Sequence, residues 1–334
     1  MSFYRALGVV MNQIVSYIIR TKNEAYALQD VCDRIRRQEG DLQHEIIIVD
    51  SGSTDGTLAI AERAADQVLC IPPEKFTWGY ALNFGIQHAS GDTVCLISGH
   101  CRLEHAHTIV DSYQILSLQD YACIYGKQVG DVCLDKIERI LLEQQYPVSP
   151  VPRTPENGLL PGVSNACCLL KKSVWEVLPF DEEVPSAEDG LWFEEIQKVG
   201  YTPAYCSKLC VIHGHKFDAE YIYRKCYWRA FQSEEIAARD YPFIWVRFWL
   251  SFFIRNMRYT SFYYWRAQKY ALGLSFWDCF QYSLLEETAV LRGRLDHRRS
   301  SGGTHKYNVL TFPRIFFWVK NRMKDAHFYE SQSG

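Results

Sequence analysis

Short runs of aliphatic and β-branched residues alternate with longer stretches of helical periodicity over the first 130 residues. Apolar runs such as Ile14–Ile19 indicate buried strands. The expected strands are Ile14–Ile19, Glu45–Val49, Gln67–Ile71, Thr93–Ile97 and Ala122–Tyr125, and the expected helices are Glu24–Arg37, Thr54–Ala65, Tyr80–His88 and His105–Leu116. Strands separated by helices of this length predict βαβ units and an α/β fold with a mostly parallel sheet flanked by helices.

The pattern changes beyond this alternating region. Residues 146–163 carry five prolines and little periodicity, which indicates a loop. A strand is expected at Ser164–Leu170 and a helix at Ala187–Val199, and from about Tyr221 onward the chain has a helical, aromatic and arginine-rich character. We therefore expect an α/β domain over residues 1–220 and a helical C-terminal region over residues 221–334.

Polar residues follow the first two expected strands directly. Arg20-Thr21-Lys22-Asn23-Glu24 comes after the first strand, and Asp50-Ser51-Gly52-Ser53-Thr54-Asp55-Gly56 comes after the second. A carboxylate at a strand end followed by a turn rich in glycine, serine and threonine suits recognition of a nucleoside, and ligands bind at the carboxyl ends of parallel strands. The second segment taken alone is equally compatible with an ordinary helix-capping turn.

Six ordered segments resemble the family 2 glycosyltransferases, which have the GT-A fold. Two are IIRTKNE and IIIVDSGSTDGT. The others are Phe76–Gly85, Ala89–Asp92, Gly126-Lys127-Gln128, and Ser164-Asn165-Ala166 leading to Ala187-Glu188-Asp189-Gly190. The spacing is similar to that of bacterial rhamnosyltransferase-like members. The resemblance implies inverting transfer of a sugar from a nucleotide-sugar donor to a glycan or polyprenyl-linked acceptor, in synthesis of a capsule, O-antigen or similar surface polysaccharide.

The resemblance also implies roles for individual residues. Asp189, in an acidic pair with Glu188 at a helix start, would be the base that removes the acceptor proton, as attack of a hydroxyl requires. The structural alternative is that both acidic residues simply favour a helix N-terminus. The residues expected around the donor are Thr21, Asn23, Glu24, Asp50 and Ser51 at the nucleoside, Asn83 near the diphosphate, and Ser98 and His100 at the end of the fourth strand.

The fourth strand departs from the family pattern. The family has Asp-x-Asp there, whose carboxylates hold a divalent cation, whereas this chain has Ser98-Gly99-His100. One hypothesis is that His100 binds a cation such as Mn²⁺ or Mg²⁺, together with His213 or His215. The other is a metal-independent enzyme that neutralises the diphosphate with cationic side chains and helix N-termini. The two later histidines are also compatible with a hydrogen-bonded core pair.

The C-terminal third is basic. Residues 216–325 hold 19 Lys and Arg against 10 Asp and Glu, a net charge of +9, while the rest of the chain has a net charge of −12. Aromatic and basic helices are typical of contact with an anionic membrane surface, and a helical core or a homo-oligomer interface is the competing interpretation. The longest apolar stretch, residues 243–254, is too short to cross a bilayer, and no nucleic-acid motif is present.

Other features set the expected compartment and the rival functions. Twelve scattered cysteines without a Cys-x-x-Cys pair, and an N-terminus unlike a signal peptide, predict a cytoplasmic protein, peripheral on the inner face of the membrane if the basic region meets lipid. The missing Asp-x-Asp leaves a non-catalytic nucleotide- or carbohydrate-binding protein as the alternative function. A nucleotidyltransferase is disfavoured because a glycine-rich basic phosphate loop near the first strand is absent.

Overall fold

The computed structural model describes residues 13–131, 136–158, 160, 162–184, 187–214, 244–269, 275–284, 286 and 290. His215 and the segment from Tyr221 to Phe243 lie outside these residues. Contacts divide the chain into two units, one of Met1–Val132 with Glu138–His215 and one of Cys133–Ile137 with Lys216–Gly334.

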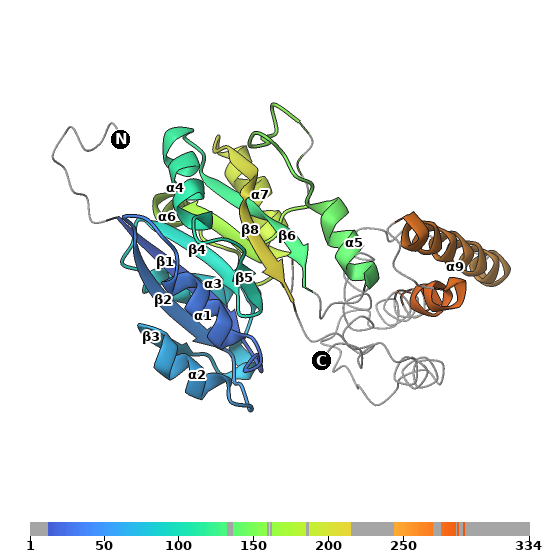
Figure 1. Ribbon diagram of the computed structural model, residues 1–334, viewed down its shortest axis with the longest axis horizontal. Helices are drawn as coiled ribbons and strands as arrows, with labels where there is room; N and C mark the ends of the chain where they lie inside the picture. Colours follow the sequence, from blue (N-terminus) through green and yellow to red (C-terminus); the bar gives the residue numbers. More distant parts are fainter. Residues whose placement is uncertain are drawn as a thin grey trace. The chain divides into compact units, whose positions relative to one another are not determined.

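An eight-stranded mixed sheet forms the first unit, with strand order β3-β2-β1-β4-β7-β6-β8-β5 (Figure 1). The strands are β1 (Ile14–Thr21), β2 (Gln43–Asp50), β3 (Gln67–Cys70), β4 (Thr93–Ser98), β5 (Cys101–Leu103), β6 (Cys123–Gly130), β7 (Cys167–Lys171) and β8 (Pro203–His213). The helices are α1 (Leu28–Arg36), α2 (Thr57–Ala64), the 3₁₀ turn η2 (Pro73–Lys75), α3 (Trp78–Gln87), α4 (Thr108–Leu118), α5 (Lys136–Gln145), α6 (Lys172–Val177) and α7 (Glu188–Lys198).

The predicted α/β fold class is confirmed, and the five strands expected in the first 130 residues are present. The sheet is less parallel than expected, since β7 runs antiparallel to both β4 and β6, and β5 runs antiparallel to β8. The sequence pattern also missed the short strand β5, the long strand β8 and the helices α5 and α6. In β8, polar Ser207 and Lys208 interrupt the apolar run where the pairing with β6 shifts register.

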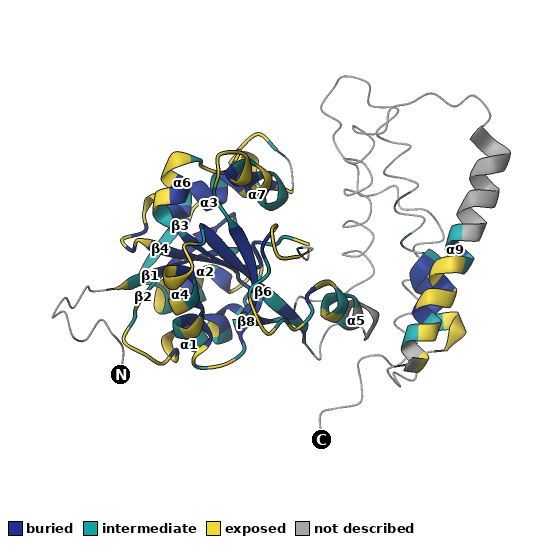
Figure 2. Ribbon diagram, turned by 90° about the horizontal axis from the view of Figure 1, so that it is seen from above, coloured by how far each residue is buried: buried dark blue, intermediate teal, exposed yellow. Residues whose placement is uncertain are grey.

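Helices cover both faces of the sheet, which explains the continuous apolar runs (Figure 2). Val15, Tyr17 and Ile19 of β1 pack in a core with α1, α2 and α4. Ile18, on the opposite face of the same strand, packs with α3, α6 and α7. Because both sets are buried, a shift of one residue in the register of β1 would exchange two cores, so this register is strongly specified.

Strand register brings the predicted polar ends to one edge of the sheet. In the parallel pairings Thr21 lies opposite Asp50, and Arg20 lies opposite Ser98. Because β7 is antiparallel to β4, it begins where β4 ends, and the backbone N–H of Ser98 donates to the carbonyl of Ala166 over 3.3 Å. The carboxyl ends of β1, β2 and β4 and the start of β7 therefore share the edge at which ligands bind in such sheets.

The second unit contains α9 (Ile244–Lys269) and the helical turns near residues 275–284. Among the described residues, no helix combines the length and the apolar character needed to span a bilayer.

Candidate active site

The turns after β1 and β2 are tied together at the sheet edge. The buried carboxylate of Asp50 accepts hydrogen bonds from the backbone N–H groups of Gly52 at 3.0 Å and Ser53 at 2.9 Å. Asn23 adopts a left-handed conformation with φ of 56°, and its side-chain oxygen accepts from the N–H of Thr54 at 2.7 Å. Left-handed backbone is uncommon outside glycine and is tolerated best by asparagine. The structure thus holds Asn23 and Asp50 in one preformed pair of turns.

Thr21 and Ser51 belong to the same cluster. The backbone N–H of Ser51 donates to the carbonyl of Thr21 over 3.2 Å, and the Thr21 hydroxyl donates to Glu24 Oε2 over 3.0 Å. Both side chains are buried. Four of the five residues expected at the nucleoside, Thr21, Asn23, Asp50 and Ser51, therefore lie together.

Glu24, the fifth, faces the end of β4. Its Oε1 contacts His100 Nδ1, and a Cβ at Gly99 would overlap with its carboxylate. The small residue in Ser98-Gly99-His100 thus admits the Glu24 side chain beside the strand end. The structure joins Glu24 to the candidate cation site as well as to the nucleoside turns.

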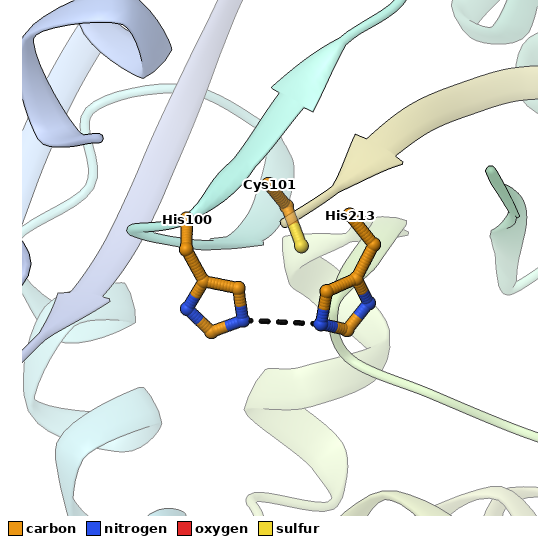
Figure 3. Close-up of side chains that lie close together, drawn as sticks. All are labelled: His100, Cys101 and His213. Atoms are coloured by element: carbon orange, nitrogen blue, oxygen red, sulfur yellow. Dashed lines mark hydrogen bonds between the residues drawn. The ribbon is translucent and has the colours of Figure 1, made fainter. Parts of the chain in front are cut away.

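His100 and His213 form an imidazole pair (Figure 3). Their Nε2 atoms lie 3.2 Å apart, with His100 between β4 and β5 and His213 at the end of β8. The other ring nitrogen of each histidine meets an oxygen, which is Glu24 Oε1 for His100 and, at 2.6 Å, Gln128 Oε1 for His213. Both oxygens are hydrogen-bond acceptors, so each Nδ1 is the protonated nitrogen in neutral imidazole.

This tautomer directs two lone pairs at each other. With both Nδ1 atoms protonated, neither Nε2 atom can donate to the other across the 3.2 Å between them, so a cation held by both nitrogens would fit this geometry. Cys101 lies beside the pair, and the three ligand atoms fall within 4.8 Å of one another. Burial raises the pKa of the Cys101 thiol well above its ordinary value, so the thiol of the metal-free protein is neutral.

Asp189 lies at the start of α7, close to the beginning of β7. Its Oδ2 accepts from the backbone N–H of Asn165 at 3.3 Å, and its Oδ1 accepts from the N–H of Gly190 at 2.8 Å. Ala187, just before the helix, has a left-handed φ of 62°, a conformation that costs a non-glycine residue about 1–3 kcal/mol. The turn gives the two acidic residues separate environments.

Glu188 differs from its neighbour because it is buried and paired. Its Oε1 lies 3.2 Å from Arg20 Nη1, and the Arg20 guanidinium lies 4.7 Å from the ring centre of Trp78. Burial raises the pKa of the Glu188 carboxyl, the positive charge of Arg20 opposes that rise, and Asp189 adds to it. We therefore assign Glu188 to positioning α7 on β1, and we retain Asp189 as the candidate base.

Asn83 does not have the position expected of a diphosphate ligand. It is buried in α3, and its Nδ2 donates to the carbonyl of Phe180 and to Glu182 Oε1, both at 2.8 Å. Its Oδ1 accepts from Trp175 Nε1 at 2.8 Å and from the N–H of Phe180 at 3.0 Å. Because protein groups engage both ends of the amide, we assign Asn83 to holding the segment before α7.

Three residues that matter to the site were not singled out from the sequence. Arg20 pairs with Glu188, Gln128 orients His213, and Asn165 contacts Asp189. Each lies in or beside one of the six segments that resemble the family, and this position is the feature of the sequence that could have indicated a role in the site. Their partners are 168, 85 and 24 residues away, so the contacts themselves depend on the fold.

Sequence comparisons find that this chain is similar to glycosyltransferases. Residues 16–132 match the model of the family described as Glycosyl transferase family 2. The O-antigen chain rhamnosyltransferase WbaN of Salmonella anatum is 24% identical over 180 residues, which cover 52% of this chain and 57% of that protein. RfbN of Salmonella typhimurium, also an O-antigen chain rhamnosyltransferase, is 23% identical over 211 residues, covering 61% of this chain and 67% of that protein. The matched segments thus span 57% of the length of WbaN and 67% of the length of RfbN.

Solved structures of similar form include a mannosyltransferase and TarS. The mannosyltransferase PcManGT from Pyrobaculum calidifontis, in complex with GDP-Man and Mn²⁺, has a TM-score of 0.48 at 16% identity, covering 95% of this chain and 81% of that chain. TarS 1–349 of S. aureus, in complex with UDP, has a TM-score of 0.49 at 16% identity, covering 90% and 95%. Because both TM-scores are below 0.5, we assign the fold from the strand order and the core described above.

The structural role of Asn83 predicts a stability defect. Asn83→Leu should lower the free energy of unfolding by about 3 kcal/mol, because several buried partners lose their hydrogen bonds. Urea denaturation measures the change. Gln87→Leu, at an exposed position of the same helix, should stay within about 0.5 kcal/mol of the unsubstituted protein. Unchanged stability of Asn83→Leu would contradict the assignment.

Proposed function

We propose that this chain is a family 2 glycosyltransferase that moves a sugar, with inversion, from a nucleotide-sugar donor to a hydroxyl of a glycan or lipid-linked acceptor in surface-polysaccharide synthesis. The observation that carries the proposal is the position of Asp189. Its carboxylate is held by two backbone N–H groups at the ligand-binding edge of the sheet, beside the start of β7. The O-antigen relatives support a glycan acceptor and make a deoxyhexose the first donor sugar to test.

The nucleoside is proposed to bind over the paired turns after β1 and β2. Asp50 is buried beneath them, and its carboxylate already accepts two backbone hydrogen bonds. The turn conformation is therefore set before the donor arrives, which lowers the ordering cost of binding. Thr21, Asn23 and Ser51 supply further polar groups at this site.

Asp189 is proposed to take the proton of the acceptor hydroxyl as that oxygen attacks the anomeric carbon. Inversion requires attack on the face opposite the departing nucleoside diphosphate. Because that group leaves as an anion and needs no acid, one carboxylate base for the acceptor hydroxyl suffices. The neighbouring Glu188 cannot readily share this role, since it is buried against Arg20. The ion pair instead keeps the start of α7 beside the strand ends.

A divalent cation fits His100 and His213. Each Nδ1 atom is hydrogen-bonded to a side-chain oxygen, of Glu24 or of Gln128. Such hydrogen bonds orient imidazole ligands and set their tautomer in metal sites. The facing Nε2 atoms are then the ligand atoms, and imidazole nitrogen binds a transition-metal cation such as Mn²⁺ more tightly than Mg²⁺. When bound, the cation would neutralise charge on the donor diphosphate; Glu24 and Gln128 hold the two histidines in place.

The helix α9 is proposed to meet an anionic membrane surface. Its described part buries polar Asn256 and Thr260 together with Tyr263, whereas Tyr259, Phe262 and Trp265 are exposed. The exposed positions therefore combine aromatic rings with polar Arg258, Ser261 and Gln268, as in helices that lie at a membrane surface. The net charge of +9 over residues 216–325 favours an anionic surface, at the inner face of the membrane where a lipid-linked acceptor would be met.

Removal of the proposed base should abolish turnover but leave the donor bound. Asp189→Asn should reduce transfer from the active donor by about 100- to 10,000-fold, the usual range for a general base. A screen of UDP-, dTDP-, GDP- and CMP-sugars by thermal shift identifies the donor, and product formation then gives the rate. Glu194→Gln, at an exposed position of α7, is the matched control and should retain full activity. Undiminished turnover in Asp189→Asn would exclude this base.

The cation proposal predicts binding that depends on both histidines. Calorimetric titration of the metal-stripped protein with Mn²⁺ should give one site, and His100→Ala or His213→Ala should weaken it at least about 10-fold. Cys101→Ser should bind Mn²⁺ within about threefold of the unsubstituted protein, because Mn²⁺ prefers nitrogen and oxygen ligands to a soft sulfur ligand. Equal Mn²⁺ affinity in the histidine variants would refute the site and favour neutralisation by cationic side chains.

The membrane proposal predicts selective binding to anionic vesicles. The full chain should sediment with vesicles of phosphatidylglycerol and phosphatidylcholine but not with phosphatidylcholine alone. The double variant Phe262→Ser with Trp265→Ser should bind about 10-fold less, because two exposed rings no longer enter the interface. Leu118→Ser, an exposed apolar position on α4, serves as the control. Equal binding of both variants would contradict the contact.

A further inference from the structure

Asn165 is a buried residue whose carboxamide lacks partners. It is 2% exposed, and neither its Oδ1 nor its Nδ2 makes a hydrogen bond in the described structure. Among the described residues, five other side chains each leave a single buried atom unpaired. An unpaired buried amide lowers stability, so its presence calls for an explanation such as a group that binds there.

The position of Asn165 points to that group. Its own backbone N–H donates to Asp189 Oδ2 over 3.3 Å. The carbonyl of the next residue, Ala166, accepts from the N–H of Ser98 at the end of β4. Asn165 therefore stands between the strand end that replaces Asp-x-Asp and the proposed base, where the two substrates must meet.

We propose that the carboxamide of Asn165 recognises a sugar hydroxyl beside Asp189, an inference that rests on the proposed glycosyltransferase function. A carboxamide offers two donor hydrogens and an acceptor oxygen, while a sugar hydroxyl both donates and accepts. Neighbouring hydroxyls on one ring thus satisfy both unpaired ends of the amide. A phosphate oxygen would satisfy only the N–H end.

Asn83 shows what a buried asparagine with a purely structural role looks like, and Asn165 differs from it. Both asparagines are almost fully buried, but protein groups engage both ends of the Asn83 amide and neither end of the Asn165 amide. Replacement by leucine, which has nearly the same shape, should therefore have opposite effects on stability. At Asn165 it removes an unsatisfied group, and at Asn83 it removes bonds.

The test combines melting temperature with turnover. Asn165→Leu should melt at the same temperature as the unsubstituted protein or higher, yet lose about 10- to 100-fold in kcat/KM because the sugar hydroxyl no longer has a partner. Asn83→Leu should melt lower. Asn165→Ala, which introduces no bulk, should show the same loss of turnover and covers the case in which leucine does not fold.

Binding measurements identify which substrate carries the hydroxyl. Titrations compare UDP with UDP-glucose, dTDP with dTDP-rhamnose and GDP with GDP-mannose, using the pair that stabilises the protein in the screen. If Asn165→Leu removes the affinity gained from the sugar, the donor ring is recognised. If that gain persists and KM for the acceptor rises, the acceptor ring is recognised, and either result supports the proposal.

Two outcomes overturn it. A melting temperature that falls as far as that of Asn83→Leu would make the amide structural, and unchanged kcat/KM in both Asn165 variants would remove it from recognition. Neither outcome affects the proposed reaction, which fails separately if Asp189→Asn retains full turnover.

Discussion

The buried ion pair between Arg20 and Glu188 is the contact on which the site depends. It joins the end of β1 to the first turn of α7, across 168 residues of chain. A buried pair contributes little net stability, but loss of one partner costs about 3–5 kcal/mol because a charge is left alone. Its main effect here is geometric, since it holds α7, and Asp189 with it, beside the strand ends.

The nucleoside turns and the imidazole pair are connected through residues that contact both. Glu24 follows the nucleoside turns and also contacts His100, so the donor region and the imidazole pair meet at one carboxylate. On the other side of the imidazole pair, the side-chain oxygen of Gln128 hydrogen-bonds His213 Nδ1. Hydrogen bonds and close contacts therefore connect the polar side chains along this edge of the sheet. A substitution of one of them is expected to change the position of its neighbour.

The departure from Asp-x-Asp has a consistent physical account. Gly99 leaves room for Glu24, and His100 supplies nitrogen where the family has carboxylate oxygen. A carboxylate is thus kept near the strand end, but it belongs to Glu24, which follows β1, and it contacts His100. An imidazole pair favours borderline cations over the hard cations that carboxylates select.

The sequence by itself determined the α/β class, the strands β1, β2, β3, β4 and β6, and the polar turns after β1 and β2, because local periodicity and turn chemistry encode these features. It also indicated Asp189 through a family resemblance. Only the tertiary structure decided that β7 is antiparallel, that the Asn83 amide is engaged by protein groups, and that Glu188 pairs with Arg20. Strand direction and side-chain partners depend on contacts between distant segments, which no local pattern records. The same holds for Asn165, whose unpaired amide is apparent only once its surroundings are known.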